Sequence, residues 1–175
     1  QTWKDFERFD FIGDGVELYS ALFGLEKFAE CTGTMGNYDD SEDWCHIDYH
    51  ISDPETIGTV IFADKTSSSY GRTVETVNAA VGIGRPVLVI TNGDIKDFPE
   101  QANVVNIPET KPGFEWMLPL MDYSPAALLA GYCCTLADRK FFNEYDPKAK
   151  EYNGSGKYFA EGTRTMKNSK IEIYI

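Results

Sequence analysis

The sequence predicts a three-layer α/β/α sandwich around a mostly parallel sheet of about five strands. Short runs of β-branched and apolar residues alternate with segments whose apolar residues recur every three or four positions. The runs are apolar throughout, which is typical of parallel strands that are buried on both faces. With 175 residues, 42% of them hydrophobic, the chain is long enough for one domain with a sizeable core and too short for two ordinary ones.

The expected strands end at turn residues. The first leads into a tight Gly13-Asp14-Gly15 turn, and a candidate late edge strand closes the chain. In chain order, the runs are 9–15, 56–63, 86–92, 103–108 and 170–175.

Four segments are expected to be helical. The amphipathic pattern of 16–31 is terminated by Gly33, Gly36 and Asn37. A short acidic helix is expected within 38–50, with Asp39, Asp40 or Ser41 as its N-cap. The others are 72–81 and an apolar helix from about Pro125 to Ala137, with Ser124 as its N-cap.

Composition changes near the C-terminus. We therefore assign 1–142 to one domain and 143–175 to a polar C-terminal tail. The chain begins with neither a Met nor a signal-peptide pattern, and we interpret it as a piece of a longer protein.

The net charge of −12 disfavours nucleic acid and anionic lipid as partners, although a nest of backbone N–H groups can still bind a small anion. The sequence contains no run of 18 consecutive apolar residues, so we predict no membrane span. Cys31, Cys45, Cys133 and Cys134 lack CxxC spacing, so we expect reduced thiols in a cytoplasmic protein and no metal site.

Chemistry is expected at the loops that follow the strands, because open α/β sheets bind ligands there. The Gly13-Asp14-Gly15 turn lacks the third glycine of a dinucleotide fingerprint, so no nicotinamide cofactor is expected. The hydroxyl-rich loop 67–76 suits a phosphate, or is an ordinary capped loop. Lys27 and Glu30 lie three apart on one helix, which fits either a surface ion pair or a functional pair.

The order of these features resembles the sugar isomerase (SIS) domain. More narrowly, it is similar to the second SIS half of two-SIS enzymes such as glucosamine-6-phosphate synthase and the fructosamine-6-phosphate deglycases. The strand with its Gly-x-Gly turn, the helical run 21–30 and His46 occur in the family's order, and the resemblance covers about residues 9–142. It implies a SIS or flavodoxin-like fold that needs neither metal nor organic cofactor.

The resemblance also implies roles for single residues. Glu30 matches the catalytic base, Lys27 the lysine beside it, and His46 the histidine linked to ring opening. The predicted substrate- and phosphate-binding positions are Ser68, Ser69, Thr73, Gly13 and Gly15. Glu17 is expected to play no part in turnover.

Some positions depart from the family pattern. Phe23 stands where the synthase has a carboxylate, and Ile47-Asp48 replaces the usual Gly-Pro after the histidine. Tyr70 replaces the second serine of the phosphate loop, and in two-SIS enzymes the working loop belongs to the first half.

The favoured hypothesis is an enzyme: an isomerase or deglycase domain that moves a proton between C1 and C2 of a sugar phosphate, as a homodimer or paired with a first SIS half. Glu30 would act as the base and Lys27 would stabilise the oxyanion. The alternatives are a non-catalytic domain that binds a sugar phosphate, and a module that serves only oligomerisation.

Overall fold

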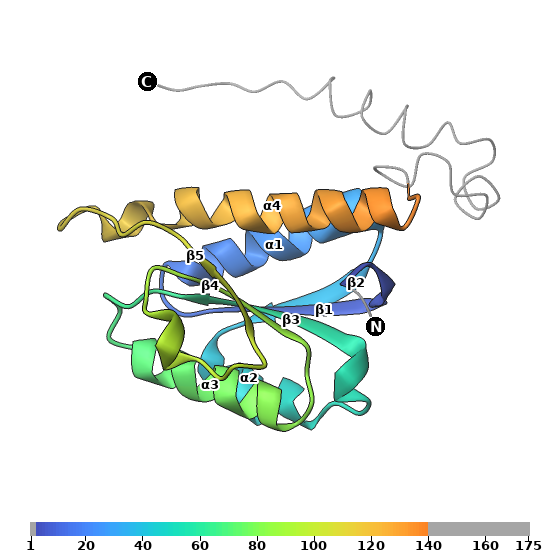
Figure 1. Ribbon diagram of the computed structural model, residues 1–175, viewed down its shortest axis with the longest axis horizontal. Helices are drawn as coiled ribbons and strands as arrows, with labels where there is room; N and C mark the ends of the chain where they lie inside the picture. The colour runs from blue at the N-terminus through green and yellow to red at the C-terminus, as the bar shows by residue number, and fades with distance from the viewer. Residues whose placement is uncertain (1–2, 140–175) are drawn as a thin grey trace, which may run out of the picture.

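The computed structural model describes residues 3–139, and these form a five-stranded, entirely parallel sheet with the strand order β2-β1-β3-β4-β5 (Figure 1). The parallel pairing brings the carboxyl ends of all five strands to one edge of the sheet. The strands are β1 (Arg8–Gly13), β2 (Met35–Asp39), β3 (Ile57–Ala63), β4 (Val87–Thr91) and β5 (Asn103–Asn106).

Helices cover both faces of this sheet, so the predicted three-layer sandwich is confirmed. Helices α1 (Glu17–Thr32) and α4 (Pro119–Leu136) lie side by side on one face, and α2 (Ser41–His46) and α3 (Tyr70–Gly82) lie on the other (Figure 1). Short 3-10 helices join these elements: η1 (Trp3–Asp5), η2 (Asp48–His50), η3 (Pro54–Thr56), η4 (Ile95–Asp97) and η5 (Glu115–Met117).

The alternation of side chains along β1 separates two cores. Phe9 and Phe11 point toward α1, where they pack against Phe28. Ile12 faces the opposite layer, in one core with Trp44 of α2. Both faces of β1 are buried, as expected for a central parallel strand, and its one buried charge, Asp10, forms an ion pair with Arg85.

Strand β2 corrects the sequence interpretation. Gly36 and Asn37 were expected to end a helix, yet they lie in an edge strand that pairs with β1 alone. A Cβ on Gly36 would lie 2.6 Å from the carbonyl oxygen of Phe9, so this glycine permits a close approach of the two strands. β2 has only five residues and is largely exposed, so its sequence contains no apolar run from which a strand could be predicted.

Helix α4 begins at Pro119, six residues before the predicted start. Ser124 is therefore not an N-cap, and Pro125 lies inside the helix, where it lacks one backbone N–H donor. The predicted tail 143–175, which includes the predicted strand 170–175, lies outside the described residues. Within residues 3–139, no helix is long and apolar enough to span a membrane.

Candidate functional site

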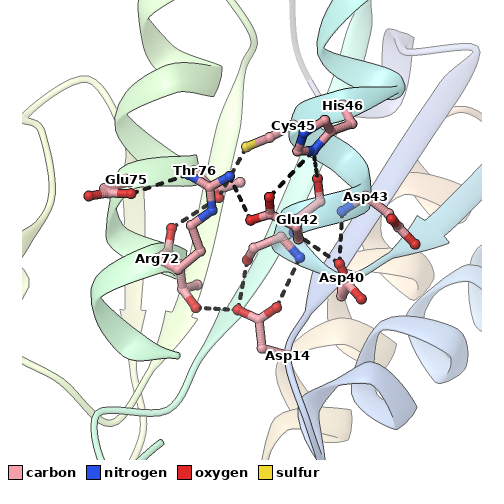
Figure 2. A network of polar contacts seen from close by, with 11 residues as sticks. Asp14, Asp40, Glu42, Asp43, Cys45, His46, Arg72, Glu75 and Thr76 are labelled. Carbon is pink, nitrogen blue, oxygen red and sulfur yellow. Dashed lines mark hydrogen bonds and ion pairs between the residues drawn. The ribbon is translucent and has the colours of Figure 1, made fainter. Parts of the chain in front are cut away.

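The loops at the carboxyl edge of the sheet are joined through Asp14, which lies in the turn between β1 and α1. Its carboxylate accepts hydrogen bonds from the backbone N–H of Ser41 at 2.9 Å and from the Ser41 hydroxyl at 2.7 Å. The hydroxyl of Thr73 donates to the same carboxylate at 2.6 Å. Asp14 therefore holds the first turns of α2 and α3 against the end of β1 (Figure 2).

Both glycines of the turn have structural reasons to be glycine. A Cβ on Gly13 would lie 2.2 Å from the carbonyl oxygen of Glu17, and Gly15 has a φ of +60° in the left-handed region. These constraints explain the Gly-x-Gly pattern without a ligand, so the predicted binding role of Gly13 and Gly15 stays a prediction.

The predicted phosphate loop precedes α3, whose first turn offers backbone N–H groups to an anion. Ser68 is exposed, and the Ser69 hydroxyl lies 2.7 Å from that of Ser67. Thr73, by contrast, is buried, and its hydroxyl donates to Asp14 at 2.6 Å and lies 3.3 Å from the carbonyl oxygen of Ser69. The loop thus brings the two serines to the surface, while Thr73 bonds to a carboxylate that would repel a phosphate.

The predicted base and its lysine form an ion pair on α1. The Nζ atom of Lys27 donates to Glu30, and this hydrogen bond raises the pKa of Lys27. The two side chains are 33% and 45% exposed, and the ammonium lies 5.5 Å from the ring centre of Phe23. The pair is open to solvent and therefore to a ligand or to a second protein surface.

His46 is the last residue of α2, on the opposite face of the sheet from α1 (Figure 1). Its Nδ1 lies 2.8 Å from the carbonyl oxygen of Glu42, so this nitrogen carries the proton, and the side chain is 68% exposed. Glu42 also binds Arg72 of α3 at 2.7 Å (Figure 2). The exposed imidazole is accessible to a ligand.

Within this chain, the predicted site residues do not lie together at one place. Glu30 lies thirteen residues beyond Glu17, which is about 20 Å along a helix, whereas the serine loop lies at the end where α1 begins. His46 belongs to the other layer. The structure brings Lys27 and Glu30 together, and it brings Thr73 to the Gly-x-Gly turn through Asp14, but it joins neither group to the other.

Three carboxylates at the start of α2 lie within 4.8 Å of one another: Asp39, Asp40 and Asp43. Asp40 caps the helix, accepting hydrogen bonds from the N–H groups of Glu42 at 2.9 Å and Asp43 at 2.8 Å. Burial, followed by the negative charge of its neighbours, raises the pKa of Asp39. Helix capping accounts for Asp40, which is one of the three predicted N-cap candidates.

Sequence reasoning missed a pair of buried acids between α1 and α4. Glu17 and Asp122 are each only 2% exposed, and Ser20 donates a hydrogen bond to Asp122 at 3.3 Å. From the sequence, Glu17 is expected to play no part in turnover, and nothing there indicates that it is buried. An acid inside the apolar run 117–134 was the available signal, and Asp122 is that acid.

The comparisons with known proteins rest on structure. No protein-family model and no curated protein sequence matches the chain. The C-terminal domain of glucosamine-fructose-6-phosphate aminotransferase from Francisella tularensis superposes with a TM-score of 0.70 at 15% identity, over 80% of this chain and 38% of that one.

Two further solved structures agree with this likeness. Tagatose-6-phosphate ketose/aldose isomerase from Escherichia coli gives a TM-score of 0.59 at 12% identity, over 73% of this chain and 36% of that one. The Vibrio vulnificus NanR protein complexed with ManNAc-6P gives 0.54 at 17% identity, over 93% of this chain and 57% of that one. The SIS resemblance is thus confirmed at the level of the fold, and this chain spans only part of each of these proteins.

Proposed function

We propose that this chain is a sugar-phosphate isomerase or deglycase domain, in which Glu30 moves a proton between C1 and C2 of the substrate. The observation that carries the proposal is the Lys27–Glu30 ion pair, which is exposed on a fold shared with proteins of sugar-phosphate chemistry. A carboxylate is a suitable base for enediol formation. An ammonium group beside it can stabilise the oxyanion that develops at the neighbouring carbon.

The proposal requires a second SIS-like unit, either another copy of this chain or a preceding SIS half. The serine loop lies near the start of α1, and Glu30 lies about 20 Å further along that helix, which is too far for one small sugar phosphate to reach both. Placing the phosphate on a loop of the second unit removes this difficulty. It also agrees with the family, in which the working phosphate loop belongs to the first half.

The outer surface of the α1–α4 layer suits such a partner. Leu128, Tyr132 and Leu136 follow one another at intervals of four residues along α4 and are 59–67% exposed. On α1, Tyr19 is 71% exposed and precedes Phe23, Lys27 and Glu30 on the same stripe. A partner docked here would bury apolar side chains and enclose the ion pair at the same time.

A second candidate function is a domain that binds a sugar phosphate without turnover. The position of His46 across the sheet from Glu30 favours it, as does the likeness to NanR, whose structure contains ManNAc-6P. Loss of the family's carboxylate at Phe23 points the same way.

Solvent isotope exchange separates the two functions. The full chain, alone and with any preceding SIS half, is incubated in deuterium oxide with a panel of hexose 6-phosphates and amino-sugar 6-phosphates. Deuterium at C1 or C2 of one of them supports the enzyme. Saturable binding of the same compounds without exchange supports the binding domain, and a panel with neither binding nor exchange contradicts both.

A further inference from the structure

Helices α1 and α4 begin side by side, and each places one acid in its first turn against the other. Glu17 and Asp122 are both 2% exposed. Within residues 3–139, no lysine or arginine forms an ion pair with either acid. Beside the acids themselves, the polar groups that act most strongly on them are Ser20 of α1 and Asp64 at the end of β3, and Asp64 adds further negative charge.

Two ionised carboxylates cannot hydrogen-bond to each other. If both acids were charged, the two Glu17 oxygens would be buried with no donor among the described residues. A single proton resolves this conflict, because a protonated Asp122 can donate to Glu17 while it accepts the hydrogen bond of Ser20. The remaining negative charge then lies at two helix N-termini, where the helix dipoles stabilise it.

We propose that Glu17 and Asp122 share one proton, and that the hydrogen bond it forms stabilises the contact between the first turn of α4 and α1. Loss of the proton places two buried negative charges in contact, so the contact between α1 and α4 weakens as pH rises. The stability of the α1–α4 layer, which carries both the Lys27–Glu30 pair and the exposed apolar stripe of α4, therefore depends on pH.

The direction of the effect follows from linkage. Burial, then the hydrogen bond and the charge of Glu17, raise the pKa of Asp122 to about 10, whereas an aspartate in the unfolded chain has its ordinary pKa of 3.8. Between these two values the folded state binds more protons than the unfolded state, so stability is lost as pH rises. One proton corresponds to about a tenfold fall in the folding equilibrium constant per pH unit.

The test compares urea unfolding of the full chain at pH values from about 6 to 8, below the range in which unfolded thiols ionise. Asp122→Asn supplies a permanent donor to Glu17, so its folding constant should not show this tenfold fall per pH unit. Glu17→Gln should behave likewise, since its amide can donate to Asp122. Glu26→Gln, which removes an exposed charge from α1, should keep the slope of the wild type.

Infrared difference spectroscopy gives a direct second readout. At pH 8 the wild type should show the C=O stretch of a protonated carboxyl group, and both Asp122→Asn and Glu17→Gln should lack it. An absent band in the wild type, or a pH slope unchanged in both variants, overturns the proposal. So does a wild type that Mg²⁺ or K⁺ stabilises at pH 8 while Asp122→Asn gains nothing, because a metal ion would then neutralise the pair.

Discussion

Replacing Glu30 with glutamine tests the proposed base with little disturbance of the fold. The side chain is 45% exposed, and its ion pair is with Lys27, three residues earlier on the same helix. Such a pair stabilises an exposed helix by only about 0.2–0.5 kcal/mol, and glutamine is as good a helix former as glutamate. We therefore expect the free energy of unfolding to change by less than about 0.5 kcal/mol.

The catalytic effect should be much larger. A positioned acid–base group contributes at least about 100-fold to turnover, which corresponds to about 2.7 kcal/mol of transition-state stabilisation. The expected loss of transition-state stabilisation is at least five times the expected change in the free energy of unfolding, so partial unfolding of the variant cannot account for the loss of turnover. We expect a lower kcat with little change in KM, because the interaction acts mainly in the transition state.

The assay is the rate of deuterium exchange at C1 or C2, measured beside a urea unfolding curve of the same preparation. Glu26→Gln is the matched control, since it removes an exposed charge from the same helix and should keep the wild-type rate. If the wild type turns over a sugar phosphate and Glu30→Gln stays within a few-fold of it, the base lies elsewhere. The Lys27–Glu30 pair would then be an ordinary surface ion pair.

Lys27→Ala should also lower turnover in the same assay, while leaving the unfolding curve almost unchanged. Thr73→Val should lower the free energy of unfolding by about 1.5–3 kcal/mol, because the hydroxyl bonds to the Asp14 carboxylate. From the sequence, Thr73→Ala is predicted to weaken sugar-phosphate affinity by a similar amount, and unchanged affinity in calorimetry would remove Thr73 from the binding site. Arg85→Met should lower the free energy of unfolding in urea by about 3–5 kcal/mol, since it removes the buried cation of Asp10 and leaves only Arg8, at 3.9 Å; a loss below about 1 kcal/mol would contradict this.

The sequence predicted best those elements of the fold that form largely buried runs or amphipathic helices. β1, β3 and β4 are such runs, and α1 and α3 have amphipathic periods, so both kinds were found close to their true bounds. β2 could not be found in this way, since its five residues Met35–Asp39 include a glycine and an asparagine. It is a strand because its backbone pairs with β1, which is tertiary information.

The predicted site was harder to assess from sequence for a different physical reason. Spacing along a helix places Lys27 near Glu30 because the contact is local, and the structure has that contact. Whether His46 shares a face of the sheet with them depends on where the chain crosses the sheet edge, and no local pattern encodes this. The contact between Glu17 and Asp122 joins residues more than a hundred positions apart, so only the packing of α1 on α4 reveals it.

The charges around the serine loop also favour a site in which a second unit supplies the phosphate loop. The phosphate of a ligand bound at Ser68 and Ser69 would lie in a region that contains the carboxylate of Asp14, which Thr73 ties to this loop. The two cations in and beside the loop are already paired: Lys65 with Glu109, and Arg72 with Glu42 and Glu75. Paired cations attract an anion weakly, because a neighbouring carboxylate cancels most of their field. A phosphate loop on a preceding SIS half, facing the exposed Lys27–Glu30 pair, would avoid this opposition and leave the loop of this chain with a structural role, whereas a second copy of this chain would bring the same carboxylate.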